Sequence, residues 1–134
     1  MSRKTILIAD DDVPMLQALA VRLRSEGYDV ILSQDWHQAL ERARVNEPDV
    51  LMVNTTLAPE ADMEAARRAI EQVVDLATTP LIAITNDSTL RSEEAVRQLG
   101  ALEHLPKPFE PARLLGAIKS ALTVGERLTA QRTQ

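Results

Sequence analysis

The chain has 134 residues, of which 45 % are hydrophobic and 26 % are charged. This length and composition suit one folded domain, and they exclude two full domains and a disordered chain. The net charge of −5 argues against a nucleic-acid groove or a membrane-surface patch, because both need a positive excess. The chain has no cysteine and only two histidines, which excludes disulfides, thiolate catalysis and Cys- or His-rich metal sites.

We expect no targeting signal in the N-terminal segment. Acidic residues follow the first short apolar run directly, from Asp10 onward, so the long apolar stretch and cleavage site of a secretory signal are missing. No apolar run approaches the length of a membrane span. We therefore expect a soluble, cytoplasmic domain that binds neither nucleic acid nor a membrane.

Five short apolar runs alternate with five stretches of helical period. Three of the runs are rich in β-branched residues and lack polar alternation, which is typical of strands buried on both faces of a parallel sheet. The alternation predicts an α/β domain with right-handed crossovers, whose functional groups gather at the carboxyl ends of the strands. We expect strands at residues 5–9, 29–32, 50–53, 81–85 and 102–105.

The helical stretches carry start and stop signals. Gly27 and Gly100 suit the residue just after a helix, and Pro111 suits the first turn of the last helix, as does Pro14 in the first. Segment 123–134 is polar, and we expect it to be a helix extension or a disordered tail beyond a domain of residues 1–122. The expected buried helix positions, in chain order, are Leu16, Leu19, Ala20, Leu23; Ala39, Leu40, Ala43; Ala66, Ala69, Ile70, Val73, Val74; Ala95, Val96, Leu99; and Leu114, Leu115, Ile118, Ala121, Leu122.

The second helix has a stronger start signal than the others. Asp35 is a favoured N-cap residue, and Gln38 follows it three positions later. This spacing predicts a capping box, in which each side chain accepts a hydrogen bond from the other residue's backbone N–H.

Acidic residues follow the first strand, at Asp10, Asp11 and Asp12. Adjacent carboxylates repel each other unless a cation neutralises them, and such oxygen ligands suit Mg²⁺. A solvated N-cap for the helix that begins near Pro14 is the alternative interpretation of this triplet.

Three other strand ends also carry polar residues, namely Asn54, Thr85 and Lys107. The Thr85 hydroxyl could bind an oxyanion, although β-propensity alone would also explain a threonine there. Prolines on both sides of Lys107 stiffen the backbone, and the Lys–Pro bond can be cis. This stiffness would aim the ammonium at the acidic residues, whereas an ordinary exposed lysine is the alternative.

Four segments together resemble the receiver domain of two-component response regulators, the CheY-like family. The resemblance covers residues 4–122 and is specific because all four segments occur in the family's order and spacing. It implies a flavodoxin-like (βα)5 three-layer sandwich with strand order 2-1-3-4-5, and a role in phosphorelay signalling in the bacterial cytoplasm. The segments are ILIADDD at 6–12, PDVLMVN at 48–54, PLIAIT at 80–85 and GALEHLPKPF at 100–109.

The resemblance also implies residue roles. In the family, an aspartate at the end of the third strand takes a phosphoryl group from a sensor histidine kinase, and Mg²⁺ neutralises its charge. Asp10 and Asp11 would be the metal pair, with the Thr56 carbonyl as a further ligand. Thr85 would be the switch hydroxyl, and Lys107 would bind the phosphoryl oxygens.

Asn54 stands where the family has the phosphoacceptor aspartate. An amide is neutral and a poor nucleophile, so the acyl phosphate cannot form there. Taken alone, an asparagine after a strand would be only a turn residue. The resemblance therefore implies a chain that is not an enzyme and that binds Mg²⁺ weakly at most.

Other residues depart from the family pattern. Ala58 is an extra residue before Pro59, and Met63 replaces the glycine that usually starts the third helix, so we expect that loop to follow a different path. His104 replaces the usual Tyr or Phe. An imidazole there could sense pH, but a half-exposed histidine without that role is the simpler interpretation.

Two functions remain open. The chain is either an atypical receiver that acts as a protein-interaction module, or a conventional receiver whose aspartate has been replaced by Asn54. The loop changes favour the first. A phosphohydrolase of the haloacid-dehalogenase type would need an adjacent acidic pair after Lys107, but only the separated Glu110 and Glu126 follow it. The four glycines are too scattered for a nucleotide-binding loop.

We expect the chain to act through a partner, because we see no room for an output domain after the fifth helix. That partner would be a sensor histidine kinase, another signalling protein or a second copy. The family's usual dimer and output face corresponds to residues 90–100, 102–105 and 111–122. Its kinase-docking helix corresponds to the first helix, with Met15 and Leu16 near its start.

Overall fold

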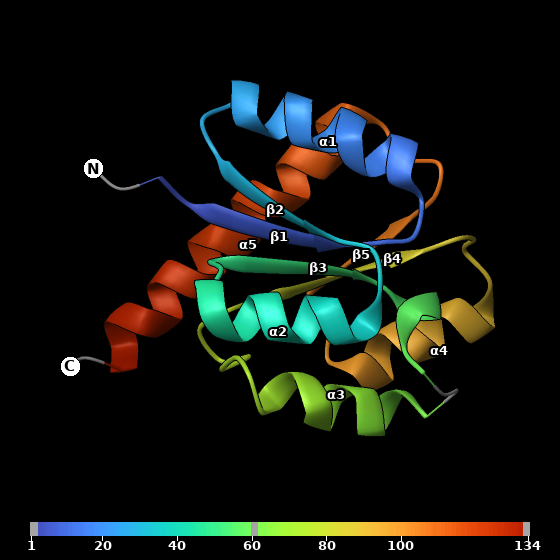
Figure 1. Ribbon diagram of the computed structural model, residues 1–134. Coiled ribbons are helices and arrows are strands. Elements are labelled where there is room, and N and C mark those ends of the chain that lie inside the picture. Colours follow the sequence, from blue (N-terminus) through green and yellow to red (C-terminus); the bar gives the residue numbers. More distant parts are fainter. Residues whose placement is uncertain (1–2, 60–61, 133–134) are drawn as a thin grey trace.

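The predicted strands form one parallel sheet in the order β2-β1-β3-β4-β5, so the predicted fold and strand order are confirmed (Figure 1). We describe it from a computed structural model, which describes residues 3–59 and 62–132. Two strands are one residue longer than predicted, and the fifth is shifted by one residue because Leu102 precedes the ladder. The strands are β1 (Thr5–Ala9), β2 (Asp29–Ser33), β3 (Val50–Asn54), β4 (Leu81–Thr85) and β5 (Glu103–Pro106).

Helices cover both faces of the sheet (Figure 1). Successive strand residues point to opposite faces. Ile6 and Ile8 of β1 therefore pack with α1 and α5, whereas Leu7 and Ala9 pack with α2, α3 and α4. The helices are α1 (Val13–Ser25), α2 (Trp36–Asn46), the 3-10 turn η1 (Thr55–Leu57), α3 (Met63–Glu71), α4 (Leu90–Leu99) and α5 (Pro111–Arg132).

Most of the predicted helix signals act as expected. Gly27 and Gly100 have φ angles of 96° and 83°, a region that glycine adopts without steric cost. The Asp35 side chain accepts a hydrogen bond from the Gln38 N–H at 2.8 Å. The other half of the predicted capping box is wrong, because the Gln38 side chain accepts from the Gln34 N–H, one residue before the cap.

The third helix is shorter than predicted. It ends at Glu71, so Val73 and Val74 lie beyond it and their N–H groups both donate to the Ile70 carbonyl. β-Branched residues favour helices weakly, and the next residue, Asp75, begins a turn. The loop with the predicted different path contains residues 60 and 61, which lie outside the described residues.

The fifth helix continues past Leu122 to Arg132. The Cα of Gly125 lies so close to the loop before β4 that an added Cβ would be 3.0 Å from the Thr78 carbonyl oxygen. Glu126 also pairs with Lys4 at 3.6 Å. Segment 123–132 is therefore helix packed against the amino end of the sheet. No helix in the described residues is long and apolar enough to cross a membrane.

The opposite, carboxyl end of the sheet holds the buried polar side chains of the described residues. These are Asp10, Ser33, Asn54 and Thr85, which are at most 1 % exposed. Each ends or directly follows one of the strands β1 to β4. Such a concentration of buried polar groups marks the carboxyl end as the place to look for a functional site.

Candidate functional site

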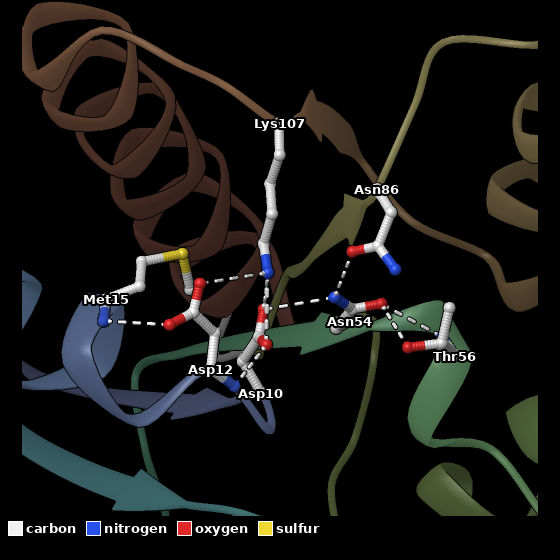
Figure 2. A network of polar contacts seen from close by, with 7 residues as sticks. All are labelled: Asp10, Asp12, Met15, Asn54, Thr56, Asn86 and Lys107. Carbon is white, nitrogen blue, oxygen red and sulfur yellow. Dashed lines mark hydrogen bonds and ion pairs between the residues drawn. The ribbon is translucent and has the colours of Figure 1, made fainter.

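A buried carboxylate lies at the centre of the site, directly after β1. Asp10 is 0 % exposed, and both of its oxygens accept hydrogen bonds (Figure 2). The Oδ1 atom accepts from the Asp12 N–H at 3.0 Å. The Oδ2 atom accepts from the Asn54 amide nitrogen at 3.1 Å. Asp10 thus links the β1–α1 loop to the end of β3.

Lys107 reaches this carboxylate from the loop after β5. Its Nζ lies 2.9 Å from Oδ2 and 3.1 Å from Oδ1 of Asp10, and 3.9 Å from a carboxylate oxygen of Asp12 (Figure 2). The Lys107 side chain is 20 % exposed. The Lys107–Pro108 peptide is cis, as the sequence allowed. The predicted aim of the ammonium toward the acidic residues is what the structure shows.

The side-chain amide of Asn54 uses its full hydrogen-bonding capacity. Its nitrogen donates to Asp10 and, at 3.1 Å, to the side-chain oxygen of Asn86. Its oxygen accepts from the backbone N–H and the hydroxyl of Thr56, at 3.0 Å and 2.9 Å (Figure 2). A carboxylate has no N–H to donate, so this pattern fits an amide and not an aspartate. We call Asp10, Asn54, Thr56, Asn86 and Lys107 the Asp10 cluster.

The surroundings of Asp10 favour its charged form. Burial is the largest single influence on the pKa of Asp10 and would raise it. The hydrogen bonds from Asp12, Lys107 and Asn54, together with the Lys107 charge, outweigh burial and hold the pKa of Asp10 below its ordinary value. Asp10 is therefore an anion at neutral pH and is balanced by the Lys107 ammonium.

The Asp10 carboxylate, one of the predicted metal ligands, already has protein partners. The oxygens of Asp10 already accept from Lys107 and Asn54, and a cation would have to displace that ammonium. Asp11 is exposed, and Asp12 caps α1 by accepting from the Met15 N–H at 3.1 Å. In residues 3–59 and 62–132, no three His, Cys, Asp or Glu side chains are grouped to hold a metal ion.

The Thr85 side chain bonds to residues outside the Asp10 cluster, although Thr85 ends the neighbouring strand. Its hydroxyl donates to the Asp87 carbonyl and lies 2.7 Å from Nε2 of His104. Because the hydroxyl has one proton, which it donates to Asp87, it accepts from His104, and this requires a proton on Nε2. Only the backbone joins Thr85 to Lys107, through an N–H to carbonyl bond of 2.8 Å.

The separation follows from strand alternation. The Asn54 side chain points to the same face as Met52, which packs with α1 and α5. The Thr85 side chain points to the same face as Ala83, which packs with α2, α3 and α4.

Asn86 belongs to the cluster but was not predicted from the sequence. Its position directly after a predicted strand was the available signal. Ser33 was not predicted either, and its buried hydroxyl has no partner in the described residues.

The comparisons with known proteins identify the family. The model of the response regulator receiver domain matches residues 6–119. The chain therefore belongs to the response regulator receiver domain family, which acts in two-component signalling. It resembles the phosphate regulon transcriptional regulatory protein PhoB of Pseudomonas aeruginosa, with 31 % identity over 124 residues, or 91 % of this chain and 53 % of PhoB.

Other relatives agree with this assignment. The transcriptional regulatory protein PdtaR of Mycobacterium tuberculosis is 28 % identical over 128 residues, which are 95 % of this chain and 60 % of PdtaR. The chain thus spans little more than half the length of these curated relatives. A CheY-like receiver domain structure from Methanospirillum hungatei has a TM-score of 0.82 and 25 % identity, covering 94 % of this chain and 98 % of that one.

Proposed function

We propose that this chain is an atypical receiver domain that is not phosphorylated at the end of β3 and that acts through protein contacts. The observation that carries the proposal is Asn54, in the position of the family's phosphoacceptor. An amide nitrogen is not nucleophilic, and an acyl phosphate needs a carboxylate oxygen. On this view the chain is not an enzyme and takes no phosphoryl group from a kinase at this position.

The hydrogen bonds of Asn54 favour asparagine as the native residue rather than as a replaced aspartate. An aspartate here would place a carboxylate oxygen against the Asp10 carboxylate, at the 3.1 Å contact that an N–H now makes. Two like charges at this separation repel each other. The same contacts support weak Mg²⁺ binding at most, because Asp10 already has a cationic partner in Lys107.

A sensor histidine kinase or another signalling protein is the proposed partner, in the bacterial cytoplasm. The face of α4, β5 and α5 is a candidate for homodimerisation, and Leu90 and Leu102 expose 83 % and 46 % of their surface there.

For kinase docking on α1, Met15 is half-buried and available for contact. Leu16, which the sequence analysis named beside it, is 2 % exposed and belongs to the core, so it cannot contribute to that surface.

Intact mass after treatment with acetyl phosphate and MgCl₂ tests the proposal. We expect no phosphoryl adduct on the natural chain and an adduct on Asn54→Asp, which restores the nucleophile beside Lys107. Asn46→Asp is the matched control at an exposed position near the end of α2, and it should gain nothing. A phosphoryl adduct on the natural chain contradicts the proposal, and fragmentation would then show whether Thr55 or Thr56 carries it.

A further inference from the structure

Long-range hydrogen bonds of the Asp10 cluster join the segments at the ends of four strands. Asp10 belongs to the loop after β1, Asn54 ends β3, Asn86 follows β4, and Lys107 follows β5. The bonded pairs are 44, 32 and 97 residues apart in sequence, for Asp10–Asn54, Asn54–Asn86 and Asp10–Lys107. The cluster therefore fixes these segments relative to one another.

The charges within the cluster balance without a metal ion. Asp10 is the buried anion, and Lys107 is the cation 2.9 Å from it. A buried ion pair is stable when hydrogen bonds also satisfy the other acceptor sites, and here Asn54 and the Asp12 N–H supply them. An incoming divalent cation would gain one carboxylate only by displacing an ammonium that already neutralises it.

Residue 54 sets this balance. With a neutral amide, one buried carboxylate faces one ammonium. With an aspartate, two buried carboxylates would face the same ammonium, in addition to the Asp12 carboxylate 3.9 Å from it, and the excess negative charge would favour a bound cation. Replacing the side-chain NH₂ of residue 54 by a carboxylate oxygen would thus convert a cation-independent site into a cation-dependent one.

We propose that Lys107 and Asn54 together take the place of a divalent cation at Asp10 and lock the surrounding loops in one ligand-independent arrangement. This inference rests on the proposed function and deepens it, because it concerns how the site is regulated. A partner would meet the same loop surface with or without Mg²⁺ and phosphodonors. The domain is then a constitutive binding module and not a switch.

Thermal unfolding with and without millimolar MgCl₂ tests this lock in the natural chain and in variants. The natural chain should melt at the same temperature in both conditions. Lys107→Met leaves Asp10 buried without its cation and should lower the melting temperature by about 10 °C. Lys119→Met is the matched control, since Lys119 is exposed on α5, and should shift it by less than about 2 °C.

Two further variants keep the test decisive. Asn54→Asp should acquire a melting temperature that rises with MgCl₂. Lys107→Met could fail to fold. That result supports the proposal only if Lys107→Arg, which keeps the charge, folds and has the same melting temperature with and without MgCl₂. If Lys107→Arg also fails to fold or depends on MgCl₂, the ammonium charge is not what replaces the cation, and the proposal is overturned.

Other outcomes overturn the inference directly. A natural chain whose melting temperature rises by more than about 2 °C in MgCl₂ contradicts it, and so does Lys107→Met melting like Lys119→Met. These results are distinct from those that test phosphorylation. A chain that binds Mg²⁺ but gains no phosphoryl group defeats this inference alone, whereas a phosphoryl adduct at residue 54 or its neighbours defeats the proposed function.

Discussion

The two ends of the sheet are built by different means. At the carboxyl end, the buried side chains Asp10, Asn54 and Thr85 meet donors and acceptors from several loops. At the amino end, α5 crosses the loop before β4 so closely that Gly125 lies against Thr78 and Pro80. The carboxyl end is distinguished by its buried polar side chains, whereas at the amino end α5 packs closely on backbone and apolar groups, and polar pairs such as Lys4–Glu126 are exposed.

This difference teaches which kind of change each end tolerates. A buried polar group costs stability unless it is paired, so the carboxyl end responds to charge and hydrogen-bonding capacity. A closely packed helix crossing responds to volume instead. Substitutions that change charge but not size should therefore act strongly at one end, and substitutions that add a methyl group should act at the other.

The largest effect is expected for Asp10→Asn, which keeps the shape of the side chain and removes its charge. The Lys107 ammonium then loses its buried partner, and the free energy of unfolding at neutral pH should fall by about 3 kcal/mol. Urea unfolding measures this. Asp11→Asn is the control, since Asp11 is exposed, and its effect should stay within about 0.5 kcal/mol. Equal effects of the two substitutions would contradict the assignment of Asp10 as the buried centre.

The stability difference between the natural chain and Asp10→Asn should depend on pH. The pKa of Asp10 is lowered in the folded state, so its contribution is complete above the unfolded-state value, about 3.9, and is lost as the pH falls through the folded-state pKa. The stability gap between the natural chain and Asp10→Asn should therefore be constant from pH 6 to 7 and shrink below about pH 4. Urea unfolding across that range checks it, and a gap that widens on acidification would give the wrong sign.

A smaller loss is expected for Asn54→Asp without Mg²⁺. Carboxylate repulsion against Asp10 and the loss of two N–H donors should destabilise the chain by about 2 kcal/mol. Asn46→Asp, at an exposed position, should cost less than about 1 kcal/mol. Chemical denaturation in EDTA measures both. An Asn54→Asp chain as stable as the natural one would mean that the site does not distinguish an amide from a carboxylate.

At the amino end, two glycines of α5 form a matched pair. Gly125→Ala would place a Cβ 3.0 Å from the Thr78 carbonyl and 3.1 Å from the Pro80 ring, and should destabilise the chain by about 1 kcal/mol. An added Cβ at Gly116 would meet nothing within 4 Å, so Gly116→Ala should stabilise the helix by up to about 1 kcal/mol. Shifts of the same sign in thermal unfolding would show that segment 123–132 does not pack as described.

The smallest effect is expected at Ser33, where a buried hydroxyl has no partner in the described residues. Ser33→Ala removes an unsatisfied polar group and should stabilise the chain by about 0.5 kcal/mol. The control is Ser25→Ala, which removes a hydroxyl that donates to the Arg22 carbonyl at the exposed end of α1. A marked loss of stability in Ser33→Ala would show that this hydroxyl has a partner in solution.

The positions of the strand ends were predictable, but the contacts between them were only partly so. The hydrophobic runs end at or just before Asp10, Asn54 and Thr85, and a parallel sheet brings such ends to one edge. The two prolines around Lys107 predicted that its ammonium would point toward the acidic residues, but not that Asp10 would be its buried partner. Pattern alone does not reveal which rotamer a side chain adopts, so the four bonds of Asn54 could not be anticipated.

Thr85 and the end of α3 show where sequence patterns stop being informative. The place of Thr85 on the other face of the sheet follows from alternation along β4, but its bond to His104 depends on the register between β4 and β5, which pairs His104 with Ala83. Helical spacing extended to Val73 and Val74, yet the turn that begins at Asp75 ended the helix earlier. Local competition between a turn and a weak helix end cannot be weighed from spacing alone.

The most direct test of the central claim is the response of the natural chain to beryllofluoride and Mg²⁺, a mimic of the phosphorylated state, followed by amide NMR. The reporters are the backbone amides of Thr56 and Lys107, which belong to the Asp10 cluster, and of Asp12, which donates to Asp10. The account predicts that their resonances keep their positions, because the cluster has neither a carboxylate at residue 54 nor a free site at Asp10. A second set of resonances for these three amides would show a switchable phosphoacceptor site and contradict the account.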